Sequence, residues 1–201
     1  MSLLCVFPQL TADDFSQRLS HLWRALEQES VPSTRLFIEW LILLGLLKHQ
    51  RPSDLASLRA RLLEFSQPAG GAVSVLTIAM HVGCKLEGAA QQTYLRESFD
   101  HLLPWLVHNN HMVRLYAIYT YDRLFALYRA DSEKSSLPEG YINMAAYLTQ
   151  SEHNQRFLAK LRREYFLAEL DPLADYNIQT IFSKLPQSAG IAHDECISMV
   201  S

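Results

Sequence analysis

The segment LVHNNHMVRLYAIYTYDRLFALY opens with the residues most suited to chemistry. His108 and His111 stand three positions apart, and imidazoles are common zinc ligands. A zinc site needs three or four ligands of defined geometry, and no third ligand lies near these two in the sequence. Asn109 and Asn110 between them are typical helix caps, so the two histidines need not share one face of a helix. We therefore predict a capped helix start here, and no metal site.

Other groups of possible metal ligands or catalytic residues are also incomplete. Three further pairs could be considered, namely His81 with Cys84, Asp13 with Asp14, and Asp194 with Glu195. The first is a lone pair without further ligands, and the acidic pairs lie near the chain ends, where nothing is expected to exclude water. The nucleophile elbow, the glycine-rich phosphate loop and the zinc-protease motif are all missing from the sequence. The sequence thus predicts no catalytic, cofactor-binding or metal-binding residue.

One basic stripe stands out. Arg156, Lys160 and Arg163 fall within an arc of about 60° on a helix, given about 100° per residue. The apolar residues of the same stretch lie on the opposite side. Such a stripe is either an ordinary solvated helix face or a surface that contacts RNA phosphate groups. The three residues are the candidate RNA-binding residues of the chain.

The overall composition limits the classes of function. The formal charge of −3 and the pI of about 6.2 do not suit a dedicated nucleic-acid binder, which is usually strongly basic. The three cysteines are odd in number and widely spaced, which favours a reducing intracellular compartment, cytoplasmic or nuclear. The N-terminus lacks a signal-peptide pattern, and the longest apolar run is too short for a membrane span, so no membrane partner is expected.

Helix signals dominate the chain, and no segment alternates with the period of a half-buried strand. Caps, prolines and glycines divide it into a series of helices. The predicted helices cover approximately residues 13–29, 33–49, 52–65, 72–85, 87–103, 110–129, a short stretch from 141, 152–170 and 171–184. The predicted fold class is therefore all-α. Residues 1–185 are assigned to one helical domain, and residues 186–201 are expected to form a flexible tail.

An internal period relates these helices. When the segments are aligned, Arg35, Ser74, Arg114 and Arg156 occupy matching positions, separated by 39, 40 and 42 residues. A period of about 40 residues is typical of two-helix HEAT repeats. We predict a HEAT- or armadillo-like repeat stack, an α-solenoid segment; the alternative is an irregular helical bundle.

The stretch from Val113 to Tyr128 is apolar nearly all round, as expected for a helix buried between neighbours. Val113-Arg114-x-x-Ala117 resembles the second-helix signature of a HEAT repeat. In that repeat the arginine joins a polar ladder between adjacent repeats. By this resemblance, Arg35 and Arg114 are the predicted ladder residues.

Three segments together resemble one eukaryotic family: residues 35–49, 108–125 and 163–197. The family is the TAR RNA-binding-protein-type tRNA guanosine 2'-O-methyltransferases. Its members have a long helical-repeat region followed by a C-terminal SPOUT domain, a knotted α/β fold that binds S-adenosylmethionine. The most specific matches are DPLADY, from Asp171, and TIFSKLP, from Thr180. The resemblance places the chain at the end of the helical region.

The family's cofactor and catalytic motifs are missing between Met1 and Ser201. These are Asn-x-Gly-Gly-x-x-Arg, Gly-Asn-Glu-x-x-Gly and a Ser-Leu-Asn loop. The resemblance therefore implies a chain that neither binds S-adenosylmethionine nor catalyses methyl transfer. It is then either a fragment or short product of such a protein, or a divergent relative that kept only the scaffold.

Two classes of function remain open. In the first, the chain is the helical part of a tRNA methyltransferase, with tRNA and a catalytic SPOUT domain as partners. In the second, it is a free-standing adaptor that binds another protein and no RNA. The resemblance favours the first class, and the near-neutral charge favours the second.

Overall fold

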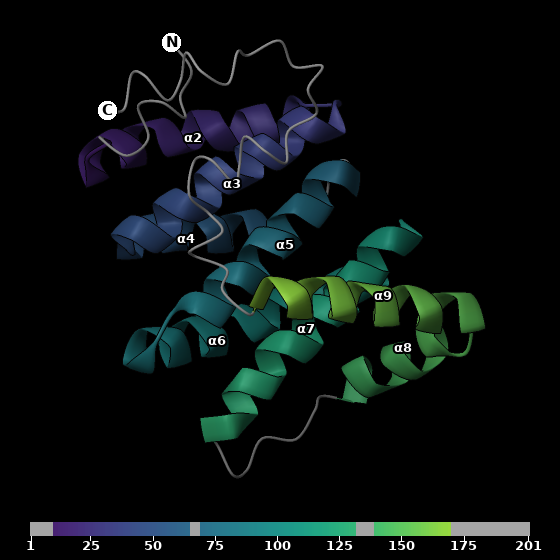
Figure 1. Ribbon diagram of the computed structural model, residues 1–201. Helices are drawn as coiled ribbons and strands as arrows, with labels where there is room; N and C mark the ends of the chain where they lie inside the picture. The colour runs from purple at the N-terminus through teal and green to yellow at the C-terminus, as the bar shows by residue number, and fades with distance from the viewer. Residues whose placement is uncertain (1–9, 65–68, 132–138, 170–201) are drawn as a thin grey trace.

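A computed structural model of the chain describes residues 10–64, 69–131 and 139–169 (Figure 1). The described residues form eight α-helices and one short 3-10 helix, with no strand among them, so the prediction of an all-α fold is confirmed. The elements are α2 (Ala12–Gln28), α3 (Pro32–His49), α4 (Pro52–Leu62), α5 (Ala69–Lys85), α6 (Gly88–Leu102), η2 (Leu103–Val107), α7 (His111–Asp131), α8 (Glu139–Thr149) and α9 (Glu152–Glu169). The predicted helix at 171–184 and the predicted tail at 186–201 lie outside the described residues.

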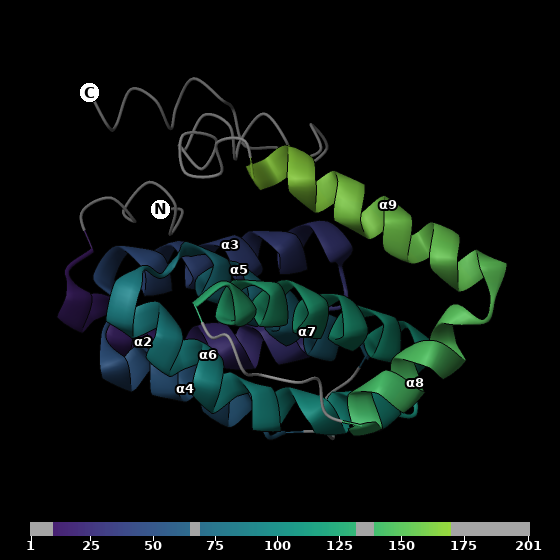
Figure 2. The ribbon, with the colours of Figure 1, turned by 90° about the horizontal axis from the view of Figure 1, so that it is seen from below.

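The helices follow one another as antiparallel pairs in two layers (Figures 1 and 2). The pairs are α2 with α3, α4 with α5, α6 with α7, and α8 with α9. The second helices of the pairs form one layer, in which α3 packs against α5, α5 against α7, and α7 against α9. In the other layer, α4 packs against α6, and α8 packs against η2. Every helix pair thus contacts the next pair along the chain.

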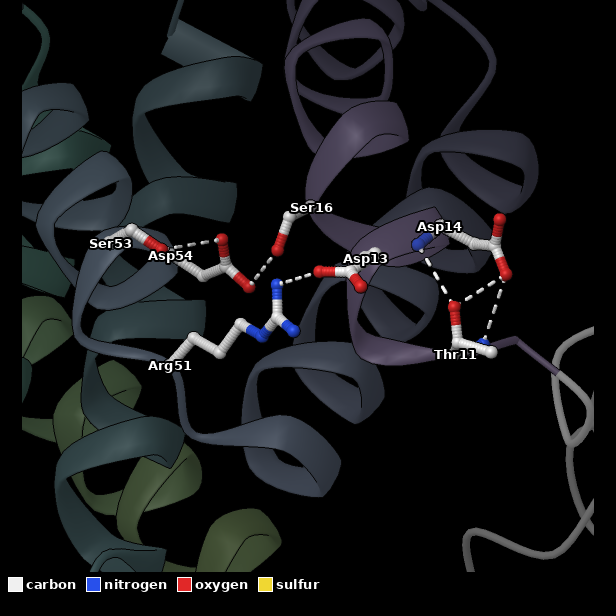
Figure 3. A network of polar contacts seen from close by, with 7 residues as sticks. All are labelled: Thr11, Asp13, Asp14, Ser16, Arg51, Ser53 and Asp54. Atoms are coloured by element: carbon white, nitrogen blue, oxygen red, sulfur yellow. Dashed lines mark hydrogen bonds and ion pairs between the residues drawn. The ribbon is translucent and has the colours of Figure 1, made fainter.

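Local sequence explains where the first pair begins. Thr11 caps α2, because its hydroxyl accepts a hydrogen bond from the amide of Asp14 at 3.2 Å (Figure 3). The Asp14 carboxylate accepts the Thr11 amide in return at 3.3 Å, which completes a capping box. These hydrogen bonds from Thr11 lower the pKa of the Asp14 carboxyl.

Polar contacts join α2 to the beginning of α4 (Figure 3). Asp54 is buried, and its carboxylate accepts the Ser16 hydroxyl of α2 at 2.8 Å. At the rim, Arg51 forms an ion pair with Asp13 at 2.6 Å, and that carboxylate is largely exposed. An exposed ion pair contributes little to stability, so the buried bond of Asp54 matters more for holding the two helices together.

Two glycines allow close contacts between neighbouring helices. A Cβ atom at Gly45 of α3 would overlap the ring of Phe15 on α2. In the same way, a Cβ atom at Gly83 of α5 would overlap the side chain of Leu124 on α7. Glycine therefore lets these helices approach more closely than any other residue would.

Helix α7 lies in the interior, as its apolar sequence predicted. It packs against α5, α6, α9 and η2. Ala117 is fully buried, and so are large side chains on several sides of the helix, among them Tyr119 and Tyr121. The prediction of an inner helix is confirmed.

Trp105 of η2 connects the end of α4 to the turn that precedes α7. Its side chain is 0% exposed, and its indole N–H donates a hydrogen bond of 2.7 Å to the carbonyl of Leu62 at the end of α4. Its ring stacks on the imidazole of His108, with the ring centres 5.7 Å apart. This one side chain fixes the turn before α7 against the end of α4.

Candidate functional site

The predicted RNA-contacting stripe lies on α9. Arg156 and Lys160 are both exposed and stand one helical turn apart on the same side of the helix. The Arg163 side chain lies outside the described residues, although its backbone belongs to α9. The structure therefore brings two of the three candidate residues together on the surface.

Arg156 is not the ladder residue of its helix. Its guanidinium forms an ion pair with Glu152, one turn earlier, at 2.5 Å. Both side chains are at least 75% exposed, so this pair is weak and screened by salt. A phosphate group could compete with the Glu152 carboxylate for Arg156.

Arg35 lies where the first two pairs meet. Its guanidinium donates to the carbonyl of Glu29, six residues earlier, and packs over Gly70 at the start of α5. One turn later, Glu39 accepts a hydrogen bond from the Ser74 hydroxyl on α5. Burial raises the pKa of the Glu39 carboxyl, while Ser74 and Arg35 act in the opposite direction. Together these residues form a polar contact between α3 and α5.

Arg114 has a related geometry on α7. Its guanidinium donates to the carbonyl of His108, again six residues earlier, at 2.7 Å, and to that of Asn109 at 3.2 Å. A second guanidinium nitrogen lies 3.2 Å from Nδ1 of His111. Because arginine can only donate, that nitrogen of His111 must be the acceptor. Arg114 thus ties the start of α7 to the turn before it.

His111 links this group of polar contacts to α9 in the next helix pair. Its Nε2 lies 2.9 Å from the side-chain oxygen of Asn154 on α9, so it donates when Nδ1 accepts from Arg114. The buried Asn154 in turn donates to the carbonyl of Leu148 at 2.7 Å. A chain of polar contacts therefore runs from α7 to the turn before α9, and sequence reasoning missed both His111 and Asn154 as its members.

On α9 the position that corresponds to Arg35 and Arg114 is occupied by Gln155. Each of the three is the fourth residue of its helix. Gln155 donates to the carbonyl of Thr149, six residues earlier, at 2.7 Å. The alignment of Arg156 with the two arginines was therefore wrong by one residue. The glutamine was missed because the neighbouring Arg156 matches Arg35 and Arg114 in residue type.

Arg114→Ala should lower the free energy of unfolding by about 1–3 kcal/mol, because the carbonyl of His108 loses its donor in a partly buried bond. Thermal unfolding followed by circular dichroism measures the effect. Arg156→Ala is the matched control, since its exposed ion pair should contribute less than about 1 kcal/mol. Equal melting temperatures for the two variants would remove the case for a ladder role of Arg114.

The asparagine and histidines of the opening segment form a cap. The Asn110 side chain accepts the amides of Met112 at 2.9 Å and Val113 at 3.3 Å, which confirms the predicted helix start. His108 accepts the Asn110 amide at 3.0 Å. Within the described ranges, no group of three or more histidine, cysteine or acidic residues is placed to hold a metal ion.

His81 and Cys84 lie on α5 near Arg123 of α7. Burial, followed by the charges of Lys85 and Arg123, lowers the pKa of His81 to about 4. Burial raises the pKa of the Cys84 thiol, against the effect of Arg123. A neutral imidazole beside a protonated thiol does not form an activated nucleophile, which requires a thiolate.

The described residues define an all-α protein built from consecutive helix pairs. Over 205 residues the chain is 23% identical to the mouse protein named tRNA (guanosine(18)-2'-O)-methyltransferase TARBP1. The similarity covers 98% of this chain but 13% of the mouse protein, so the chain corresponds to a small part of that relative. No family model matches the chain, and no solved structure matches it.

In the part of the chain that the structure describes, no helix combines the length and the hydropathy needed to cross a bilayer.

Proposed function

We propose that the chain is a HEAT-type helical-repeat segment that binds tRNA, or holds it for methylation, within an intracellular tRNA 2'-O-methyltransferase system. The observation that carries this proposal is the similarity to the mouse tRNA methyltransferase along 98% of the chain. In this proposal the methyl-transfer chemistry and S-adenosylmethionine belong to a SPOUT domain, and no step of the reaction is assigned to residues of this chain.

The contacts between pairs support the HEAT-type arrangement. Three side-chain contacts link successive helices of the second layer: Glu39 with Ser74, Thr120 with the Leu76 carbonyl, and His111 with Asn154. Their partners are 35, 44 and 43 residues apart in the sequence, close to one repeat length. Recurrent contacts at this spacing are what stacked two-helix repeats require.

The exposed cations of α9 are the proposed tRNA contact. Arg156 and Lys160 point to solvent, and the weak pair with Glu152 can exchange for a phosphate. With Arg163 as the third member, the stripe offers three phosphate contacts. Because each contact contributes a slope of about −0.7 to −0.9, tRNA binding should weaken with salt at a slope of order −2 to −3 in log–log terms.

Filter binding of unmodified tRNA across a salt series tests this prediction. The test variant carries Arg156→Glu, Lys160→Glu and Arg163→Glu. The matched control carries Arg18→Glu, Arg24→Glu and Arg96→Glu, which reverse the same number of charges at exposed positions on α2 and α6. We expect the test variant to lose retention and the control to keep most of it. Equal retention by the unsubstituted chain and the test variant would show that the stripe is an ordinary solvated helix face.

A second candidate function is a protein-interaction adaptor without an RNA role. The net charge of −3 favours it, because little electrostatic attraction for a polyanion is available outside a local patch. The same salt series separates the two functions. If the unsubstituted chain retained no tRNA even at low salt, that result would favour the adaptor.

A further inference from the structure

Helix α3 meets α5 through a row of three polar groups: the Glu39 carboxyl, the Ser74 hydroxyl and the Gly70 carbonyl. The Oγ of Ser74 lies within hydrogen-bond distance of Oε1 of Glu39, and 3.0 Å from the carbonyl oxygen of Gly70, one turn earlier on α5. Ser74 is 1% exposed. Because a hydroxyl carries a single proton, Ser74 can donate to only one of these two acceptors at a time.

The number of hydrogen bonds in this row depends on whether Glu39 carries a proton. An ionised carboxylate can only accept, so Ser74 then donates either to Glu39 or to Gly70, and the other contact lacks a proton. A protonated carboxyl donates to the Oγ of Ser74, and the Ser74 hydroxyl is then free to donate to the Gly70 carbonyl. The same three groups therefore form two hydrogen bonds when Glu39 is protonated and one when it is ionised.

The surroundings of Glu39 compensate its negative charge only in part. Arg35, one turn earlier, is the charged group that acts on Glu39, but its guanidinium donates to the carbonyl of Glu29. Residues 69–80 of α5 contain no ionisable side chain. On α2, which also packs on α3, the ionisable residues from position 21 onward are exposed or already paired: His21, Arg24 and Glu27. Burial therefore raises the pKa of the Glu39 carboxyl.

The row lies where the first helix pair joins the rest of the described stack. Both α2 and α3 pack against α5, and α2 makes further polar contacts with α4, such as that of Ser16 with Asp54. A charge placed between α3 and α5, together with the loss of one hydrogen bond, weakens one of these two attachments.

We propose that the contact between Glu39 and Ser74 is a proton-sensitive joint between the first helix pair and α5, closed when Glu39 is protonated and weakened when Glu39 is ionised. Because folding raises the pKa of this carboxyl above its ordinary value of 4.5, the folded chain keeps the proton to a higher pH than the unfolded chain does. The joint therefore contributes fully below pH 4.5, and its contribution is lost as the pH rises through the pKa of the folded state. The proposal is independent of any role in tRNA methylation.

Glu39→Gln tests the joint, because the glutamine amide has the shape of the protonated carboxyl and can donate to Ser74 at every pH. We expect this variant to raise the melting temperature by about 2–4 °C at pH 7.5 and by much less at pH 4.5. Glu87→Gln, at an exposed position just before α6, is the matched control and should show no such gain. The proposal is wrong if the effect of Glu39→Gln is the same at both pH values, or if its gain at pH 7.5 is no larger than that of the control.

Hydrogen exchange locates the effect within the stack. Protection factors, in which the intrinsic pH dependence of exchange cancels, are measured for the amides of α3 and α7 at pH 4.5 and pH 7.5. We expect the protection of α3 relative to α7 to fall with rising pH more in the unsubstituted chain than in Glu39→Gln. Equal changes in the two proteins would overturn the proposal, because the joint would then not respond to the proton on Glu39.

Discussion

Trp105→Ala is expected to lower the free energy of unfolding by about 3–5 kcal/mol. The indole is 0% exposed, so its removal leaves a large cavity between the end of α4 and the start of α7. The Leu62 carbonyl also loses its donor, and His108 loses the ring on which it stacks. Urea unfolding followed by far-ultraviolet circular dichroism measures the change.

Two further variants separate the causes of this loss. Trp105→Phe keeps most of the apolar volume but not the hydrogen bond, and should cost about 1–3 kcal/mol. Val107→Ala alters a neighbouring side chain that is 68% exposed, and should stay within about 0.5 kcal/mol. If Trp105→Ala cost no more than Val107→Ala, the indole would not join the pairs as the structure shows.

The second large effect is a loss of stability in mild acid that depends on His81. Its pKa is about 4 in the folded protein, below the ordinary value of about 6.5 for histidine, because burial and the nearby charges of Lys85 and Arg123 disfavour the protonated imidazole. Below pH 6.5 the unfolded chain takes up a proton at this residue and the folded chain does not. Stability is therefore complete above pH 6.5 and is lost as the pH falls toward 4, by about 3 kcal/mol at most.

Urea unfolding at pH 7 and at pH 4.5 tests this prediction. His81→Gln should reduce the difference in unfolding free energy between the two pH values, because glutamine does not titrate. Some difference should remain, since burial also lowers the pKa of His49. His21→Gln, at an exposed position on α2, is the matched control for the substitution itself. A pH difference that His81→Gln leaves unchanged would contradict the prediction.

Helix boundaries were the most predictable part of the fold, because their causes are local. Thr11 and Asn110 were recognisable as caps from their residue types and their place before an apolar run, and both cap helices in the structure. Proline suits the first turn of a helix, and α4 begins at Pro52. The burial of α7 followed from an apolar pattern without a polar side.

Contacts between pairs were less predictable, because they join residues far apart in the sequence. Nothing near Trp105 indicates that its partner is a carbonyl 43 residues earlier. The predicted period located the contacts only approximately, which is why Arg156 was aligned where Gln155 lies. The α9 stripe was also predicted incompletely. It was defined by its cations alone, and Glu152, one turn before Arg156, forms an ion pair with it.

Methyl transfer to a ribose hydroxyl requires a shaped cofactor pocket, a group that orients the hydroxyl, and a positioned acceptor. The polar side chains discussed above are instead engaged in caps and in contacts between helices, or lie on exposed helix faces. Whether this helical stack performs methyl transfer itself can be decided by one assay. Residues 1–201 are incubated with S-adenosylmethionine, radiolabelled on its methyl group, and unmodified tRNA. We predict label on the tRNA at the level of the protein-free control; label clearly above that level would show that the stack carries its own catalytic site.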